Sequence, residues 1–334
     1  MSTWQTDYTF LRDSAGVIDL GSRGRLCVAG PDRVRFLNGQ VTNNVKDLKA
    51  GEGCYAALVN AKGRIQSDLN IYCLPDELLL DFEPGLAAIV SQRLEKYVIA
   101  DDVQIVDVSA NFGMLTIQGP KSGDVIKAVG LTTPVKAFDW SKTSDSEIYC
   151  MNHARGTAVG FDIFVPTGDT AEFYERTLQA ARKGGGGASS FEALETIRIE
   201  AGIPRFGVDM DDSNLAPEAG IDARAISYSK GCYIGQEVIS RIRAYGQVAK
   251  SLRGLRLPSE VPSLPQRHDK LFRDGKEVGY VTSATRSPKF GAAIALGYIR
   301  REHNTAGSVL QIRSGNGEFS GVVCDLPFSR DLMN

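Results

Sequence analysis

The sequence predicts an α+β protein with two α/β lobes and a small antiparallel β-barrel at the C-terminal end. Across residues 25–201, short apolar runs typical of strands alternate with stretches of helical periodicity, which favours α/β lobes. From Ser251 onward, short β-runs are separated by turn sequences such as Asp274-Gly275, which favour hairpins. At 334 residues, the chain has room for two or three lobes of ordinary size.

In the first lobe, strand and helix patterns alternate. Strands are predicted at 25–28, 55–59, 69–73, 78–82, 103–108 and 114–117, and helices at 32–38, 85–97 and 121–129. Within the helix at 85–97, apolar residues recur at helical spacing. This spacing predicts one buried face that comprises Leu86, Ile89, Val90, Leu94 and Val98.

The second lobe repeats this alternation of strand and helix patterns from residue 147 onward. Strands are predicted at 147–151 and 161–165, and helices at 170–182 and 190–201, the last with Phe191, Leu194 and Ile197 on one side. The intervening run at 183–187 is almost pure glycine and predicts a flexible surface connection. It does not suit a phosphate-binding loop, because no Lys-Ser or Lys-Thr follows it and no strand leads into it.

The C-terminal region has a different pattern. Short β-runs are predicted at 252–257, 270–273, 278–283, 292–298, 308–312 and 319–324, which suits a small antiparallel barrel or sandwich. We place the boundary near 248–251. The predicted domains are therefore 1–249, with lobes at about 1–140 and 141–249, and a β-barrel at 250–334.

Composition excludes some classes of partner. The net charge is -2 and the pI is about 6.0, which gives no support for nucleic-acid binding. No apolar run reaches the roughly 18 residues that cross a bilayer. The first 13 residues also lack the basic and apolar regions of a secretory signal. These features predict a cytoplasmic protein without nucleic-acid or membrane partners.

The six cysteines and three histidines form no metal-binding pattern, so we predict no metal site. Four cysteines lie in or beside apolar runs and are expected to be buried: Cys27, Cys73, Cys150 and Cys324. The histidines are far apart in the sequence and next to turn or polar residues. We expect His153, His268 and His303 to be surface or loop residues.

Cys232 lies in a different context from the other cysteines, the segment Ser229–Glu237, which reads SKGCYIGQE and leads into a helix through Arg241 and Arg243. Lys230 and a helix N-terminus would both stabilise a thiolate at Cys232. The residues alone leave two interpretations equally open. Cys232 is either a reactive thiol or a half-buried residue in a tight structural turn.

Two stretches in this region resemble a known family. LETIRIEAGIPRFGVDM and KGCYIGQEVISRIRAYG are similar to the YgfZ-type folate-binding proteins, a branch of the aminomethyltransferase (glycine-cleavage T-protein, GcvT) superfamily. Residues 32–72 resemble the opening lobe of that superfamily, and residues 279–303 resemble its C-terminal barrel. The likeness covers nearly the whole chain in order.

The resemblance implies a GcvT-like ring of three domains with tetrahydrofolate, or a one-carbon-substituted folate, at its centre. In T-proteins, an aspartate of a Gly-Gly-x-x-Asp-Asp-Leu segment lies beside the folate nitrogen. Asp68 matches the second aspartate of that segment, and Ser67 replaces the first. The implied role of Asp68 is to bind the folate amine and to orient it or take its proton. Without the resemblance, Asp68 reads as a solvated residue at the start of a strand.

The resemblance also implies folate ligands elsewhere. T-proteins carry a pterin-binding Glu in a Tyr-Thr-Gly-Glu-x-Gly-Phe-Glu stretch, whereas the matching segment 155–162 has Ala158 at that position. Glu200 matches a second acidic position and is predicted to bind the pterin; otherwise it is a helix-surface carboxylate. Basic residues are expected to bind the anionic glutamate tail, foremost Arg205 and Arg241, with Lys62, Arg64 and Arg243 as further choices.

Three functions follow from these expectations. The first is a YgfZ-type accessory factor that binds folate and supports iron–sulfur enzymes, with Cys232 as the functional thiol. Its partners would be iron–sulfur proteins or their assembly factors. The second is a true aminomethyltransferase that moves a one-carbon unit to tetrahydrofolate, for which Asp68 is the catalytic carboxylate. The third is a folate-binding scaffold without catalysis.

Overall fold

The computed structural model describes residues 4–258, 260–261, 263–315 and 317–329. The chain divides into two compact units. The first contains residues 1–194 and 224–236, and the second contains 195–223 and 237–334. The predicted domain boundary at 249/250 stays a prediction. No helix in the described residues is both long and apolar enough to cross a membrane.

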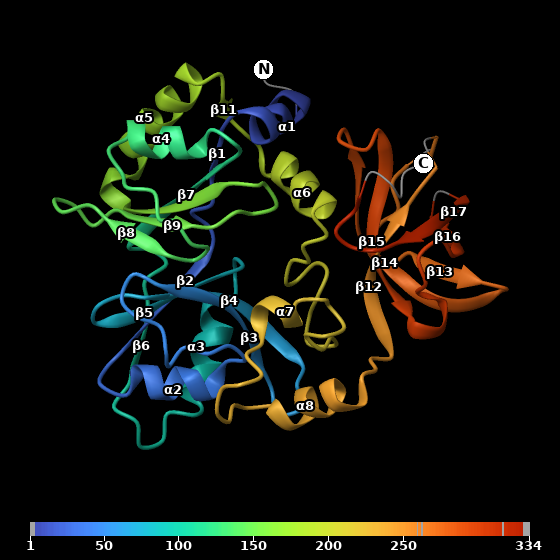
Figure 1. Cartoon of the computed structure of the whole chain (residues 1–334), viewed down its shortest axis with the longest axis horizontal. Helices are drawn as coiled ribbons and strands as arrows, with labels where there is room; N and C mark the ends of the chain where they lie inside the picture. The colour runs from blue at the N-terminus through green and yellow to red at the C-terminus, as the bar shows by residue number, and fades with distance from the viewer. Residues whose placement is uncertain (1–3, 259, 262, 316, 330–334) are drawn as a thin grey trace. The chain divides into compact units, whose positions relative to one another are not determined.

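The first unit contains a five-stranded sheet with the order β3-β4-β5-β2-β6. Its strands are β2 (Gly24–Ala29), β3 (Gly53–Val59), β4 (Ile65–Cys73), β5 (Glu77–Phe82) and β6 (Gln104–Asp107). Helices α2 (Arg33–Gln40) and α3 (Ala87–Glu95) pack against it (Figure 1). The predicted elements are present here. The predicted apolar face of α3 is wrong at Ile89, which is 54% exposed, whereas Val90 and Leu94 are buried in the core.

A six-stranded sheet with the order β11-β1-β7-β10-β9-β8 completes the first unit. It comprises β1 (Gly16–Asp19), β7 (Phe112–Gln118), β8 (Trp140–Lys142), β9 (Tyr149–Asn152), β10 (Gly160–Pro166) and β11 (Gly187–Ala188). Helices α4 (Ser122–Ala128) and α5 (Thr170–Lys183) pack against it, and α1 (Trp4–Asp13) contacts β1 and β11. The N-terminal strand β1 thus joins the six-stranded sheet, beside β7, and not the five-stranded sheet that contains the next strand, β2.

The two sheets of this unit face each other, with their helices on the outer sides (Figure 1). Successive side chains of β4 point to opposite faces of its sheet, which explains how one strand contacts both the helices and the other sheet. Leu69, Ile71 and Cys73 join the core under α2 and α3, so the side chains between them point to the other sheet. The buried rings of Tyr72 and Phe164 meet edge-to-face there, with centroids 6.2 Å apart.

The glycine run is more ordered than composition predicts. Gly187 pairs with Gly16 of β1, so the run ends in a strand and not in a free loop. A Cβ atom built on Gly186 would lie 2.1 Å from the Ala15 carbonyl oxygen. Glycine is needed there because the backbone of the run comes so close to that of Ala15. The prediction of a flexible surface connection is therefore wrong for residues 186–187.

The second unit contains a closed antiparallel barrel with the order β12-β15-β14-β13-β16-β17. Its strands are β12 (Lys250–Arg256), β13 (Lys270–Arg273), β14 (Lys276–Ser287), β15 (Ala292–Arg300), β16 (Val309–Ser314) and β17 (Gly317–Cys324). Buried Asp209 ties the segment before the barrel to β14, since it accepts hydrogen bonds from the hydroxyls of Thr282 and Ser283.

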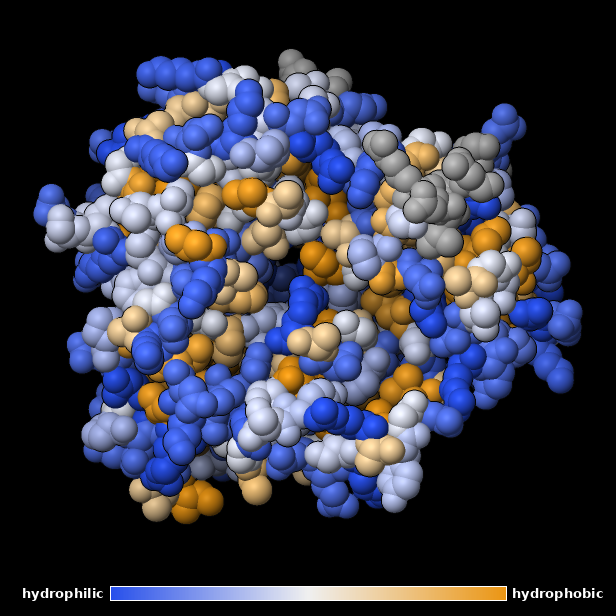
Figure 2. Space-filling view, viewed as in Figure 1, coloured by the Kyte–Doolittle hydropathy of each residue, from blue (hydrophilic) through white to orange (hydrophobic). Residues whose placement is uncertain are grey.

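Three further helices are α6 (Phe191–Glu200), α7 (Asp222–Ala225) and α8 (Gln236–Tyr245). The apolar side predicted for α6 is wrong at Phe191, which is 46% exposed, whereas Leu194 and Ile197 are buried. Figure 2 shows one face of the protein, on which hydrophilic residues predominate and hydrophobic ones form small separate groups.

Candidate functional site

Strand register gathers polar side chains on one face of the five-stranded sheet. Tyr55 of β3 lies opposite Asn70 of β4, which in turn lies opposite Asp81 of β5. Asp68 lies two residues before Asn70 and therefore points to the same side. That side faces the six-stranded sheet. A polar surface inside the unit is the result, and Asp68 lies within β4 and not at its start.

Asp68 is half-buried, and its carboxylate accepts a hydrogen bond of 2.9 Å from the Tyr55 hydroxyl. Burial raises the pKa of Asp68 to about 6, and the nearby negative charge of Glu83 adds to the effect. The Tyr55 hydrogen bond and the Arg23 charge act in the opposite direction. Asp68 is thus a carboxyl group that changes charge close to neutral pH, as a proton acceptor in catalysis needs.

We predict that the Asp68 carboxyl titrates with a midpoint near pH 6 in the folded protein, measured from its carboxyl ¹³C shift. Because the folded pKa lies above the ordinary aspartate value of 3.8, ionisation of Asp68 destabilises the fold as pH rises from about 4 to about 6. Glu83→Gln is expected to lower the midpoint, since it removes a neighbouring negative charge. A wild-type midpoint near 4 would contradict this account.

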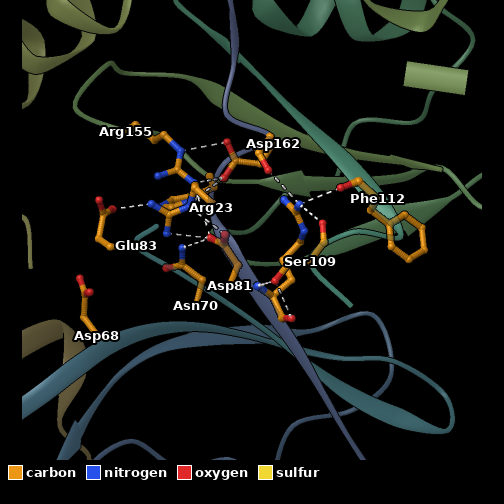
Figure 3. Close-up of polar contacts among 12 residues, drawn as sticks. Arg23, Asp68, Asn70, Asp81, Glu83, Ser109, Phe112, Arg155 and Asp162 are labelled. Atoms are coloured by element: carbon orange, nitrogen blue, oxygen red, sulfur yellow. Dashed lines mark hydrogen bonds and ion pairs between the residues drawn. The ribbon is translucent and has the colours of Figure 1, made fainter. Parts of the chain in front are cut away.

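A buried charge network lies beside Asp68 (Figure 3). The Arg23 guanidinium binds both oxygens of Asp81, at 2.8 and 3.0 Å, and also pairs with Glu83. The Asn70 amide donates a further bond of 2.8 Å to Asp81. Asp81 is fully buried and Arg23 is 8% exposed. Charges so deeply buried need these partners, which fix the positions of Arg23 and Glu83.

The network continues to the six-stranded sheet. Arg155 binds the fully buried Asp162 of β10 through two bonds, of 3.0 and 2.7 Å, and its guanidinium lies 3.6 Å from Asp81 of β5. His153 Nδ1 lies 2.7 Å from the same Asp162. His153 lies in a loop directly after β9, as expected, but it is not a surface residue, because Asp162 draws its ring into the unit, where the side chain is 16% exposed.

The segment that carries Cys232 is anchored through Lys230. The Lys230 ammonium donates to the carbonyl oxygens of Asn38, Val41 and Asn43, at 2.5, 2.8 and 2.7 Å. Three bonds use all three protons of an ammonium group. Burial lowers the pKa of Lys230 to about 8. Lys230 therefore has a structural role, and the prediction that it stabilises a thiolate at Cys232 is wrong.

Cys232 itself is exposed on the loop that precedes α8. All six cysteines lie in the described residues, and Cys232 is the one that is exposed. The burial predicted for Cys27, Cys73, Cys150 and Cys324 is confirmed, and Cys54 is half-buried. Because Cys232 is exposed, the interpretation of it as a half-buried turn residue is wrong.

Gly235 brings this loop close to the backbone of Asn60. Its φ is +83°, and a Cβ atom there would lie 2.5 Å from the Asn60 carbonyl oxygen. We predict that Gly235→Ala destabilises the protein by about 1–3 kcal/mol in urea unfolding, because a side chain adds both strain and a clash. Gly231→Ala is the matched control: nothing lies within 4 Å of its Cβ position, and its effect should be small. Equal stabilities of the two variants would contradict the prediction.

The other predicted site residues belong to the second unit. Glu200 is 1% exposed and accepts a hydrogen bond from the Ser287 hydroxyl, so it is not a helix-surface carboxylate. Arg205 is half-buried and pairs with Glu195 at 3.2 Å. Arg241 is exposed on α8. In the first unit, the structure places Asp68 in the polar face and Cys232 on an exposed loop.

Sequence reasoning missed most of the polar and charged residues near Asp68: Tyr55, Arg23, Asp81, Glu83, His153, Arg155 and Asp162. A signal was present, because Asp81 and Asp162 are charged residues inside apolar strands. Buried charges of this kind are rarely accidental. Their partners are far away in sequence, so the pairing itself needed the structure.

Comparisons with known proteins agree on the family. The GCVT N-terminal domain matches residues 1–230, and the glycine cleavage T-protein C-terminal barrel domain matches residues 250–329. An aminomethyltransferase of Halothermothrix orenii is 25% identical over 332 residues, covering 96% of this chain and 90% of its own length. A chloroplastic protein of Arabidopsis thaliana that is named as a transferase is 28% identical over 319 residues, covering 93% and 71%.

A solved structure shows the same fold. The glycine cleavage system aminomethyltransferase T from Bartonella henselae superposes with a TM-score of 0.88 at 22% identity, covering 98% of this chain and 90% of that one. The predicted fold class, mixed α/β lobes followed by a closed C-terminal β-barrel, is therefore confirmed. With family matches over both regions, this chain belongs to the aminomethyltransferase-like glycine cleavage T-protein (GcvT) family.

Proposed function

We propose that this protein binds tetrahydrofolate and transfers a one-carbon unit to it, as an aminomethyltransferase does. One observation carries the proposal: Asp68, held by Tyr55 on an internal polar face, has a pKa of about 6. Relatives named as aminomethyltransferases give further support. A carboxylate that ionises near neutral pH can accept a proton from an amine or return one to it.

The residues around Asp68 fit the chemistry of a folate amine. When bound, tetrahydrofolate supplies the nitrogen atoms that accept a one-carbon unit. Asp68, ionised above pH 6, would hold an amine N–H in position and receive its proton. The Tyr55 hydroxyl donates to one carboxylate oxygen, Oδ2, and so holds the carboxylate in place for such a contact. The negative charge of Glu83 raises the pKa of Asp68, and the positive charge of Arg23 lowers it.

Glu200 is kept as the proposed pterin ligand, since a carboxylate can pair with the adjacent N–H and amino donors of the ring. The roles of Arg205 and Arg241 as ligands of the glutamate tail stay predictions. Calorimetric titration with tetrahydrofolate tests the binding. We expect wild type to bind, Glu200→Gln to bind more weakly, and exposed Glu147→Gln to bind as wild type does. No heat of binding to wild type would contradict the proposal.

A second function is favoured by one specific observation, the exposed thiol of Cys232 in a KGCYIGQE loop. This motif resembles that of YgfZ-type proteins, so we also propose a folate-binding accessory factor for iron–sulfur enzymes. Such a factor needs a thiol that a partner protein can reach, which Cys232 provides.

Cys232→Ser separates the two functions. In cells that lack the protein, iron–sulfur enzyme activity should be restored by wild type and by Cys54→Ser, but not by Cys232→Ser, if the accessory role is correct. In the transfer assay with purified protein, Cys232→Ser should match wild type. Full restoration by Cys232→Ser would remove the accessory role and leave the transferase function standing.

A further inference from the structure

Arg224 lies beside the residues on which the proposed function depends. Its guanidinium carbon is 5.2 Å from the centroid of the Tyr55 ring, within the range of a cation–π interaction. The hydroxyl of that ring donates to Oδ2 of Asp68 at 2.9 Å. All three residues belong to the first unit. They form a chain of contacts that leads from an exposed cation to a half-buried carboxylate.

The backbone at Arg224 is tied to the strand that carries Tyr55. The Asn43 side-chain amide donates to the Tyr55 carbonyl oxygen at 2.8 Å and to the Arg224 carbonyl oxygen at 3.1 Å. The Thr42 hydroxyl donates to the carbonyl oxygen of the next residue, Ala225, at 2.6 Å and accepts from a β3 amide at 2.9 Å. Two side chains thus bridge the segments. These bonds fix the position of Arg224 beside Tyr55, although the two residues are far apart in sequence.

The charge of Arg224 is available to the ring. Arg224 is exposed, and within the part of the chain that the structure describes it forms no ion pair. Burial and the negative charge of Asp68 raise the pKa of Tyr55 well above the usual range, with a smaller contribution from Glu83, and Arg224 acts in the opposite direction. The guanidinium therefore has an electrostatic effect on the hydroxyl that binds Asp68.

A cation over a phenol ring makes the phenol hydroxyl a stronger hydrogen-bond donor. The positive charge draws electron density from the ring, so the O–H bond becomes more polar. Polar contacts that follow one another in a chain strengthen each other in this way. A stronger hydrogen bond to a carboxylate favours its charged form over its neutral form. Through Tyr55, Arg224 thus favours the ionised form of Asp68.

We propose that Arg224 is a positioning residue for the Asp68 carboxylate and acts on it through the Tyr55 ring, an inference that rests on the proposed function. Two other charges face Asp68: Glu83 opposes its ionisation, and Arg23 favours it. Arg23 is held inside the buried network, whereas Arg224 approaches from the exposed side. The role of Arg224 is to keep Asp68 ionised, and so able to accept a proton, at the acidic end of the neutral range.

The test is a double-mutant cycle read from the carboxyl ¹³C titration of Asp68 in the full chain. Arg224→Gln should raise the midpoint by about 0.3–0.5 pH unit, the part of an exposed cation–π interaction that one hydrogen bond passes on. Arg224→Lys keeps a cation and should restore most of the wild-type midpoint. In Tyr55→Phe, which has no hydroxyl, Arg224→Gln should cause less than half of this shift.

Two results would overturn the inference. An unchanged midpoint in Arg224→Gln would show that the cation does not act on Asp68. A shift in the Tyr55→Phe background at least half as large as in wild type would show that Arg224 acts directly by its charge and not through the ring.

The rate of one-carbon transfer gives a second readout. At pH 6, Arg224→Gln should lower kcat about twofold, because a smaller fraction of Asp68 is ionised, whereas at pH 8 its kcat should equal that of wild type. Arg182→Gln is the matched control, since Arg182 is an exposed arginine of α5 in the same unit, and its loss should change neither the midpoint nor kcat. An equal loss of kcat at both pH values would show a merely structural role for Arg224 and refute the inference.

The outcomes separate this inference from the proposed function. If wild type transfers the one-carbon unit but Arg224→Gln titrates as wild type does, the inference fails and the proposed function stands. If Arg224→Gln raises the Asp68 midpoint but wild type forms no product, the action of Arg224 on Asp68 holds and the transferase function fails.

Discussion

Asp68→Asn is expected to lower the rate of one-carbon transfer about 10²- to 10⁴-fold, the usual contribution of a positioned general base. The amide has nearly the same shape as the carboxylate and can still accept the Tyr55 hydrogen bond, but it has no basic oxygen. Tetrahydrofolate should still bind, so the loss should appear in kcat more than in KM. The measurement is the steady-state transfer rate at saturating tetrahydrofolate.

The pH profile gives this prediction its control. Wild-type activity should rise with pH through about 6, where Asp68 ionises, and this rise should be missing in Asp68→Asn. Asp76→Asn is the matched substitution, since Asp76 is an exposed residue in the turn between β4 and β5. An Asp68→Asn protein with wild-type kcat would show that Asp68 is not the base.

The second large effect concerns stability. Asp81→Ala should lower the free energy of unfolding by about 3–5 kcal/mol, because it removes the main partner of a buried guanidinium. Arg23 would keep only its pair with Glu83, and Asn70 would lose an acceptor. The same loss would weaken the link to Arg155, whose guanidinium lies 3.6 Å from Asp81.

Urea unfolding followed by tryptophan fluorescence measures this effect well. Both tryptophans, Trp4 and Trp140, lie in the first unit, so the signal reports the part of the chain that contains Asp81. Glu147→Ala is the control: it breaks an exposed ion pair with Lys142 in the same unit and should stay within about 0.5 kcal/mol of wild type. An Asp81→Ala protein as stable as this control would refute the role of the network.

Local patterns predicted the elements because each helix or strand depends mostly on its own residues. Alternation in β4 and Asp-Gly turns in the C-terminal region are signals of this kind. The position of β1 was not predictable in the same way. It leaves its neighbour β2 and pairs with β7, at residues 115–118, and with β11, at 187–188. Such pairing depends on long-range packing, which no short window contains.

The site, too, was predictable where local sequence sufficed and not where contacts between distant residues decide. The resemblance pointed to Asp68, but its pKa depends on Tyr55, Glu83 and Arg23, which come from other strands and loops. Lys230 was misjudged because its sequence neighbour is Cys232, whereas its hydrogen-bond partners are about 190 positions away. Adjacency in sequence is weak evidence for a contact when a side chain as long as lysine can point elsewhere.

The most direct test of the central claim is a single-turnover transfer assay. Purified protein is mixed with an aminomethylated lipoyl carrier protein and tetrahydrofolate, and formation of the one-carbon folate is followed over time. We predict product formation that requires the protein and is lost in Asp68→Asn. If wild type binds tetrahydrofolate but forms no product, the transferase function is wrong, and the accessory role through Cys232 becomes the better explanation.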